Sequence, residues 1–234
     1  MSQIGENIKA IQQQKAEAAR RAGRDPEDIL LVAVTKTYGP EAMNQAIEAG
    51  ITDIGESKVQ EILDKFDSVL PVRWHMIGHL QTNKVKYIID KVAMIHSVDS
   101  LKLAKEIDRR AAQHGLTMDI LLQVNAAEEE SKFGVSMEDT EGLLQQILAE
   151  CPNLRIKGLM HIAPAADDPE DVRVWFREVK KLYDKLGAAQ HPNLDFHWLS
   201  MGMSHDFPVA VEEGSNMIRV GTAIFGQRYY PEKN

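Results

Sequence analysis

The stretch LLVAVTKTYGPEAM, residues 30–43, decides how the rest of the chain is interpreted. It opens with five apolar residues in a row, a pattern typical of a strand that is buried on both faces. A single lysine, Lys36, follows, and the Gly39–Pro40 pair then marks a turn with proline at the first position of a helix. The stretch therefore predicts a strand, a turn and a helix, with an ammonium group at the carboxyl end of the strand.

The same alternation of short apolar runs and amphipathic helices continues along the chain. The expected strands are 29–36, 52–57, 72–79, 93–99, 118–126, 155–163, 194–202 and 217–226, and clear helical patterns occupy 40–50, 100–115 and 169–187. Strands that are separated by helices or turns of this kind run parallel. Eight such units in 234 residues predict an α/β fold, a single (β/α)8 TIM barrel. An open doubly wound sheet is the alternative, but its usual Gly-rich first turn is missing.

No linker divides the chain, so we expect one domain over residues 1–234, with 163–171 as the loop after the sixth strand. With 44% hydrophobic and 26% charged residues the composition is that of a globular protein. A net charge of -8 argues against nucleic acid or an anionic membrane as a partner. No signal peptide or membrane span is expected, and the lone Cys151 reads as a structural thiol, so we expect a cytoplasmic protein. The acidic run 128–130 is expected to be a solvated loop face.

Small and hydroxyl-bearing residues gather at the carboxyl ends of the last two expected strands. They are Ser200, Gly202, Ser204, Gly221 and Thr222. In this architecture the loops after the seventh and eighth strands commonly bind phosphate. A helix that begins near His205 would add free N–H groups and a positive dipole end. These residues predict a phosphate site, although Ser/Gly turns are common and the signal is weak by itself.

Lys36 stands across the expected barrel mouth from this phosphate site. A lysine that simply extends into solvent from its strand end is the plainer interpretation. A partly desolvated amine, however, loses its proton more readily and can then attack an aldehyde. Pyridoxal 5'-phosphate (PLP) carries both an aldehyde and a phosphate, and we therefore expect it as the cofactor.

Arg219 lies two residues before Gly221, so both are expected to point into the barrel mouth from one strand. A guanidinium remains protonated at any working pH and would donate a hydrogen bond to a pyridine nitrogen. That nitrogen would stay unprotonated, and the ring would be a poorer electron sink. The alternative for Arg219 is an ordinary surface or ion-paired arginine.

At this point the sequence resembles the YggS/PROSC family of PLP homeostasis proteins, which share the barrel of the alanine racemase N-terminal domain. The matching blocks are LLVAVTK around Lys36, GES-VQE at 55–61, WHMIGHLQTNK at 74–84, SKFG at 131–134, GLM at 158–160, LSMGMS at 199–204 and IRVGTAIFG at 218–226. Each block is weak alone, but their order along almost the whole chain is highly specific.

The resemblance implies that Lys36 carries PLP as a Schiff base and that Arg219 faces the pyridine nitrogen. It also implies that Ser200, Gly202, Ser204, Gly221 and Thr222 hold the phosphate region. The family's GENY block reads GESK here, so Ser57 and Lys58 replace an asparagine and a tyrosine. The asparagine's contact near the cofactor is then either lost or taken over by the shorter Ser57, which we keep as a candidate cofactor-binding residue. The family's SLGMS reads SMGMS, an exchange of similar volume that should matter little.

The racemases that share this barrel carry a second domain, whose tyrosine acts as a second base. The sequence offers no such domain, and Tyr229 and Tyr230 are expected to be ordinary surface or packing residues. We therefore expect a non-catalytic PLP carrier or regulator in vitamin B6 homeostasis, with no catalytic residue. A low-activity amino-acid racemase or another PLP enzyme is the alternative, and a Schiff-base aldolase on a phosphorylated sugar is a third. Besides the cofactor, PLP-dependent apoenzymes are candidate partners, and a monomer is expected.

The histidines do not predict a metal site. His75 and His79 are four residues apart, but they fall on a strand and its turn, so they would not share one helical face. His161 and His197 lie near strand ends and are expected to be packed or hydrogen-bonded core histidines. No metal is assigned.

Overall fold

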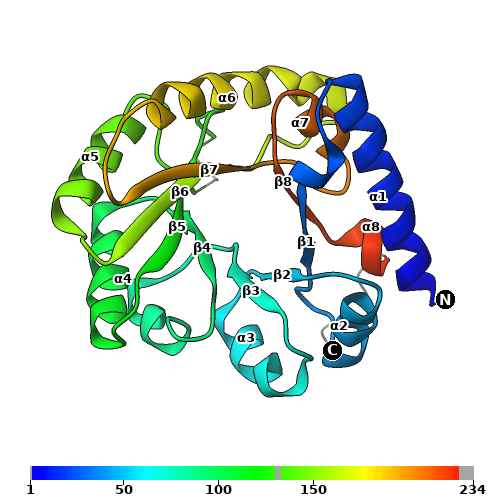
Figure 1. Ribbon diagram of the computed structural model, residues 1–234, viewed down its shortest axis with the longest axis horizontal. Helices are drawn as coiled ribbons and strands as arrows, with labels where there is room; N and C mark the ends of the chain where they lie inside the picture. Colours follow the sequence, from blue (N-terminus) through cyan, green and yellow to red (C-terminus); the bar gives the residue numbers. More distant parts are fainter. Residues whose placement is uncertain (1, 130–132, 227–234) are drawn as a thin grey trace.

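The computed structural model describes residues 2–129 and 133–226. Its eight parallel strands close into a barrel in the order β1 to β8, with β8 pairing back onto β1. Figure 1 shows the strands in a ring with the helices outside it. The predicted TIM barrel is therefore confirmed, and the open-sheet alternative is excluded.

Each predicted strand is present, most of them shorter than expected. The strands are β1 (Leu30–Val34), β2 (Asp53–Glu56), β3 (Arg73–Met76), β4 (Met94–Val98), β5 (Met118–Val124), β6 (Leu154–His161), β7 (Leu194–Ser200) and β8 (Met217–Val220). The eighth differs most from its prediction. Its second half, Thr222–Phe225, forms the short helix α8, because the chain turns away from the barrel at Gly221.

The helices connect the strands on the outside of the barrel. They are α1 (Gln3–Arg21), α2 (Pro40–Glu48), α3 (Val59–Lys65), α4 (Leu101–Gln113), α5 (Thr140–Glu150), α6 (Arg173–Gly187), α7 (Phe207–Glu212) and α8 (Thr222–Phe225). Short 3-10 helices occupy Pro26–Asp28, Phe66–Ser68, Thr82–Tyr87 and Pro169–Val172. The expected helix over 169–187 thus begins with a 3-10 turn, capped by Asp168, whose side chain accepts a hydrogen bond from the N–H of Glu170.

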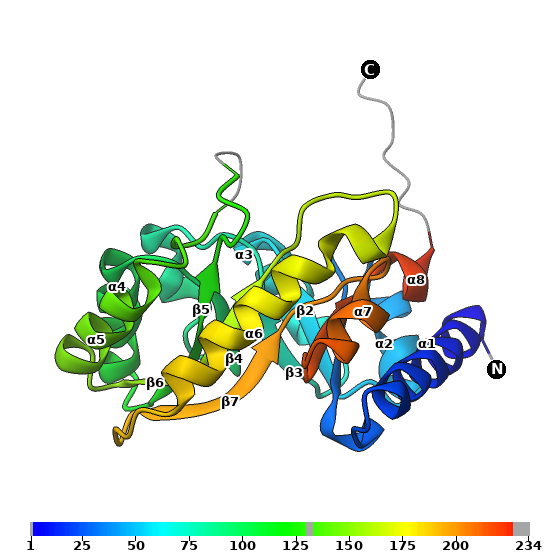
Figure 2. The same ribbon diagram turned by 90° about the horizontal axis from the view of Figure 1, so that it is seen from above.

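The N-terminal helix α1 lies beside α7 and α8 and so joins the two ends of the described chain (Figures 1 and 2). The amide of Asn7 donates to the carbonyl oxygen of Ile224 at 2.8 Å. Arg24 donates to the carbonyl oxygens of Val211 and Ser215, at 2.7 Å each. These contacts hold the last βα units, which carry the expected phosphate site, against the first helix.

Two apolar clusters define the inside and the outside of the barrel. A small cluster holds one residue from each of five strands, Val32, Met94, Leu121, Met160 and Met217, and can only lie in the barrel interior. A much larger cluster packs the outer strand faces against the helices. Since side chains alternate along a strand, the interior cluster tells which residues of each strand face inward.

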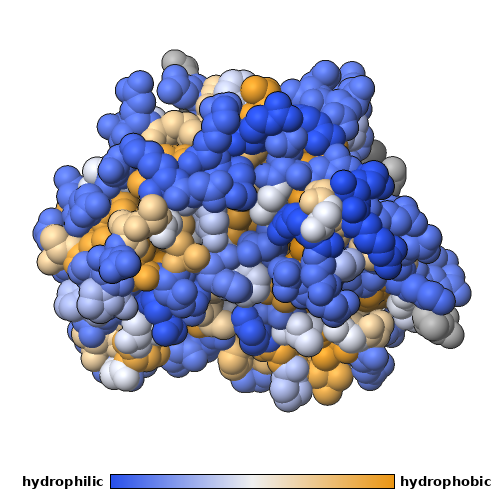
Figure 3. Space-filling model, turned by 45° about the horizontal axis from the view of Figure 1, so that its top comes forward, coloured by the Kyte–Doolittle hydropathy of each residue, from blue (hydrophilic) through white to orange (hydrophobic). Residues whose placement is uncertain are grey.

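The surface is mostly hydrophilic, with hydrophobic side chains in scattered patches on the face shown in Figure 3. In the part of the chain that the structure describes, no helix is long and apolar enough to cross a membrane.

Candidate functional site

Lys36 comes after β1 and is in phase with the residues of that strand that face the barrel interior. Val32 belongs to the interior cluster, and every second residue of a strand faces the same side, so Val34 and the position of Lys36 also face the interior. The strand ends at Val34, two residues earlier than predicted, and Lys36 lies in a turn where it is half-buried. Thr37, directly after it, has a φ of 72°, which is rare for a residue other than glycine. The turn thus holds the lysine at the mouth of the barrel and starts the chain back outward.

Arg219 faces the barrel interior, as its spacing from Met217 of the interior cluster requires. Its guanidinium is buried; Nη1 donates to Ser200 Oγ at 2.6 Å, and Nη2 donates to the carbonyl oxygen of His161 at 2.8 Å. Burial lowers the pKa of the guanidinium to about 10, against the raising effect of the Asp206 carboxylate. Arg219 is therefore a cation at neutral pH, and the surface-arginine alternative is wrong.

The turn after β7 requires glycine at position 202. Gly202 has a φ of 95°, and a Cβ there would lie 2.7 Å from Cβ of Ala210 and 2.9 Å from Cα of Phe207. Its carbonyl oxygen accepts the N–H of Arg219 at 3.0 Å. This close packing brings the loop after β7 against β8 and sets Ser204 over the start of α8.

Ser204 connects the loops after β7 and β8. Its Oγ accepts the N–H groups of Gly221 and Ala223, at 3.3 Å each, which leaves the hydroxyl hydrogen to donate elsewhere. Gly221 is buried, whereas Thr222 is exposed at the start of α8. The predicted phosphate residues therefore lie together here, with the exception of Ser200, which is buried beneath them against Arg219.

The lysine turn and the β8 loop are held side by side. A Cβ on Gly221 would lie 3.1 Å from the carbonyl oxygen of Val34, two residues before Lys36. Tyr38 stacks on Phe225 with ring centroids 4.7 Å apart, and its hydroxyl donates to the carbonyl oxygen of Gly226 at 2.7 Å. An amine and a hydroxyl-lined turn thus meet at one side of the mouth, because β1 and β8 are neighbours, whereas the sequence analysis expected them across the mouth from each other.

A buried ionic cluster, which sequence reasoning missed, braces the lysine turn from the side of α3. Lys65 Nζ lies 2.8 Å from Glu56 Oε1 and 2.7 Å from Glu61 Oε2, and it also donates to the carbonyl oxygen of Thr35 at 3.2 Å. Glu61 Oε2 accepts the N–H of Thr37 at 2.7 Å. These bonds hold both sides of Lys36 and stabilise the positive φ of Thr37. The only sequence signal was a glutamate at the carboxyl end of a short expected strand.

The carboxylates of this cluster titrate in opposite directions. Burial raises the pKa of Glu56, and the hydrogen bond from Lys65 opposes it only in part. Burial would raise the pKa of Glu61 as well, but hydrogen bonds from Lys65 and from the N–H of Thr37 outweigh it, and the pKa falls. Oε2 of Glu56 is buried without a hydrogen-bond partner among the described residues.

Ser57 lies on the side of β1 opposite to β8, because β1 pairs with both β2 and β8. It follows β2, is half-buried, and lines a shallow cavity with Lys58, Val59, Gln60, His79, Gln81 and Lys84. The structure thus places it beside two lysines and a histidine. A contact from Ser57 to the cofactor stays a prediction.

Of the four histidines considered in the sequence, two are buried and two are exposed. His161 is buried, and its Nδ1 lies 3.0 Å from the carbonyl oxygen of Val124, as expected of a hydrogen-bonded core residue. The same expectation for His197 is wrong, because its side chain is exposed against Trp198. His79 is exposed and stacks on Phe133, whereas His75 is buried in the barrel interior. Within 2–129 and 133–226, no three His, Cys, Asp or Glu side chains cluster as metal ligands would.

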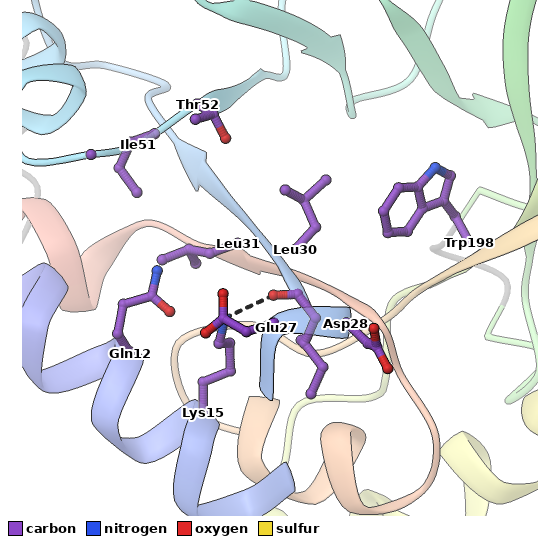
Figure 4. A pocket seen from close by; sticks show the side chains of 11 residues that line it. Gln12, Lys15, Glu27, Asp28, Leu30, Leu31, Ile51, Thr52 and Trp198 are labelled. Atoms are coloured by element: carbon purple, nitrogen blue, oxygen red, sulfur yellow. Dashed lines mark hydrogen bonds between the residues drawn. The ribbon is translucent and has the colours of Figure 1, made fainter. Parts of the chain in front are cut away.

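A second cavity lies at the amino end of the barrel, where the buried lysine is hydrogen-bonded to the backbone. Its volume is about 220 Å³. Figure 4 shows side chains that line it, among them Gln12, Lys15, Glu27 and Thr52. The buried Lys15 donates to the carbonyl oxygen of Ile29 at 2.8 Å. Burial lowers its pKa, partly offset by Glu27. None of the predicted site residues lines this cavity.

The remaining predictions concern single groups. Cys151 is buried directly after α5, and burial raises the pKa of its thiol to about 11, as befits a structural residue. Tyr229, Tyr230, Glu130 and the first two residues of the SKFG block lie outside the described residues.

A parallel barrel with an inward lysine after β1, an inward arginine on β8 and a hydroxyl-lined turn between them defines a barrel of the alanine racemase N-terminal type. The family model for "Alanine racemase, N-terminal domain" matches residues 7–229. Alanine racemase from Corynebacterium glutamicum shares the fold, with a TM-score of 0.64 at 18% identity over 97% of this chain and 63% of that chain.

Relatives of higher sequence identity show to which family of these barrels the chain belongs. The pyridoxal phosphate homeostasis protein of Aquifex aeolicus is 42% identical over 96% of this chain and 98% of its own. PipY of Synechococcus elongatus, solved with PLP bound, is 33% identical over 95% of this chain and 100% of its own, with a TM-score of 0.82. The chain belongs to the pyridoxal phosphate homeostasis protein family.

Proposed function

We propose that this protein binds PLP at the barrel mouth, holds it covalently through Lys36, and serves in PLP homeostasis without catalysing a reaction of its own. The observation that carries the proposal is the pairing of Lys36 after β1 with the Ser204–Gly221 turn, whose backbones approach at Val34. PLP, when bound, supplies an aldehyde that condenses reversibly with amines.

The donor set of the mouth fits this cofactor. The hydroxyls of Ser204 and Thr222 suit a phosphate, with Gly202 and Gly221 leaving room for close backbone approach. Arg219, with two of its nitrogens bound to Ser200 and His161, presents a fixed cation that suits a hydrogen bond to the pyridine nitrogen. Lys36 supplies the amine. PipY, 33% identical to this chain, was solved with PLP bound, which supports PLP as the cofactor.

The charge state of Arg219 supports a binding role over an enzymatic one. A guanidinium with a pKa of about 10 remains a donor at neutral pH and keeps a ring nitrogen unprotonated. Carbanions on the bound cofactor are then poorly stabilised, because the neutral ring withdraws less charge. Slow amino-acid racemisation is the alternative that this property disfavours.

A titration of the purified protein with PLP tests the proposal. We expect saturable binding of one equivalent with a new visible absorption band, and loss of that band in the Lys36→Ala variant. A Lys58→Ala variant, which changes an exposed lysine near the mouth, is the matched control and should bind as the wild type does. Steady racemisation or other turnover of free amino acids that disappears with Lys36→Ala would replace the proposal with the enzymatic alternative. Absence of any saturable binding would refute both.

A further inference from the structure

A chain of buried polar side chains crosses the interior of the barrel and ends on Arg219. His75 Nε2 lies 2.8 Å from Asp53 Oδ1, and His75 Nδ1 lies 2.8 Å from His96 Nε2. His96 Nδ1 lies 3.3 Å from Ser200 Oγ, which accepts from Arg219 Nη1 at 2.6 Å. Each of these side chains is at most 3% exposed. Together they run from β2 through β3, β4 and β7 to β8.

The surroundings of Asp53 and of His96 set the protonation states of these two side chains. Burial would raise the pKa of Asp53, but hydrogen bonds from His75 and Thr52 and the charge of Arg73 outweigh it, so the carboxylate is ionised. Arg73 Nε lies 3.0 Å from the same oxygen, Oδ1. Burial, helped by the charge of Arg219, holds the pKa of His96 well below its usual range, so that ring is neutral. The chain thus has an anion at one end and a cation at the other.

Only one direction of donation satisfies every group with both imidazoles neutral. The carboxylate of Asp53 can only accept, so His75 Nε2 carries hydrogen and His75 Nδ1 accepts. His96 therefore donates from Nε2, and its Nδ1 accepts the hydroxyl hydrogen of Ser200. The Ser200 oxygen in turn accepts from Arg219. The reverse direction would require a doubly protonated His75 next to a neutral His96, because His75 would then donate from both ring nitrogens.

We propose that Asp53, His75, His96 and Ser200 form a one-way hydrogen-bond relay that fixes the guanidinium of Arg219 for the ring of the bound cofactor. The first three are positioning residues, since they act through Ser200 and Arg219. The role toward the cofactor rests on the proposed function; the direction of the relay does not. One consequence revises the sequence expectation for Ser200, because its hydroxyl hydrogen is committed to His96 and cannot also bind a phosphate.

Histidine tautomers in the ligand-free protein test the relay directly. Long-range 1H–15N NMR of 15N-histidine-labelled protein distinguishes protonated from unprotonated ring nitrogens, and His75→Gln and His96→Gln variants assign the signals. We expect both rings to carry hydrogen on Nε2 alone at pH 7. A hydrogen on Nδ1 of His96 in the wild type would overturn the relay, whatever the protein binds.

Two substitutions at a distance from His96 test whether the relay transmits an effect. Asp53→Asn keeps the size of the side chain and removes the anion; we expect at least one tenth of His96 to adopt the Nδ1–H tautomer and PLP affinity to fall about 3- to 10-fold. Arg73→Gln removes the exposed partner of Asp53 but keeps the carboxylate, and should leave the tautomer unchanged and affinity within about 2-fold. Ser200→Ala breaks the relay from its other end and should also release the His96 tautomer, so the test survives if Asp53→Asn does not fold.

The outcomes separate the relay from the proposed function. If the wild type fails to bind PLP, the proposed function falls, and the tautomers still decide the direction of the relay. If the wild type binds PLP but Asp53→Asn changes neither the His96 tautomer nor the affinity, the relay is wrong and the proposed function stands.

Discussion

The two ends of the barrel use the same kinds of residue for different purposes. At the amino end, the buried Lys15 donates to the carbonyl oxygen of Ile29 and sits beside Glu27, so its amine is used in packing α1 onto the barrel (Figure 4). At the carboxyl end, Lys36 lies in a braced turn next to glycines and hydroxyls. A lysine at an end of the barrel is therefore informative only together with its neighbours: Lys15 serves the packing of α1, and the surroundings of Lys36 support the proposed cofactor site.

Two glycines, one at each end of the barrel, show the same contrast. Their replacement by alanine gives the largest expected loss of stability. Gly202 and Gly50 have nearly the same φ, 95° and 100°, but a Cβ on Gly202 would meet two atoms within 3 Å, whereas a Cβ on Gly50 would meet nothing within 4 Å. Gly202→Ala should cost about 3 kcal/mol, from left-handed strain together with overpacking. Gly50→Ala should cost about 1 kcal/mol from strain alone. Urea unfolding of both variants measures the difference, and equal losses would contradict the account of the β7 turn.

Acid sensitivity is the next largest effect and reports on the barrel interior. The pKa of His96 is lowered by burial in the folded state, so the unfolded chain binds the proton more readily, and stability falls as pH drops through the unfolded value near 6.5. Between pH 7 and pH 5 this residue alone should cost about 2 kcal/mol of unfolding free energy. A His96→Gln variant should lose that part of the pH dependence. The exposed His114 provides a control, since His114→Gln should keep the wild-type slope.

The structural assignment of Lys15 gives a third test. Lys15→Met keeps the aliphatic stem but leaves the carbonyl oxygen of Ile29 without its donor. We expect a loss of about 1 to 2 kcal/mol in stability and no change in PLP affinity. Thermal unfolding and a PLP titration of the same sample separate the two. A variant that keeps its stability but loses PLP would reverse the comparison between the two ends.

A pair of serines gives the smallest predicted effect. Ser204→Ala removes the acceptor for two N–H groups and the hydroxyl that we propose to bind the phosphate, and PLP affinity should fall about 10-fold, or about 1.4 kcal/mol. Ser215 is buried before β8, and its Oγ bonds to the carbonyl oxygen of Met201 at 2.7 Å. Ser215→Ala should lower stability and leave the affinity of the remaining folded protein unchanged. Equal affinity losses in the two variants would show that the Ser204 turn is no special contact.

Much of the barrel could be predicted from the sequence, because strands buried on both faces are nearly continuous apolar runs. The inward direction of Arg219 followed from its alternation with Gly221. The short β8 was missed because the apolar residues of α8 continue the same run. Neither the Lys65 cluster nor the His75–His96 pair could be predicted, since both depend on which strands and helices become neighbours when the barrel closes. Their only trace in the sequence was a polar residue, such as His96 or Glu56, within an expected strand.

The central claim is that Lys36, and no other lysine, bonds to the cofactor. The most direct measurement is borohydride reduction of the PLP-loaded protein, followed by proteolysis and mass spectrometry of the modified peptide. The account predicts one modified site, at Lys36, with Lys15 unmodified. A stoichiometric adduct on Lys15, Lys58 or another lysine, or an undiminished adduct in the Lys36→Ala variant, would contradict it.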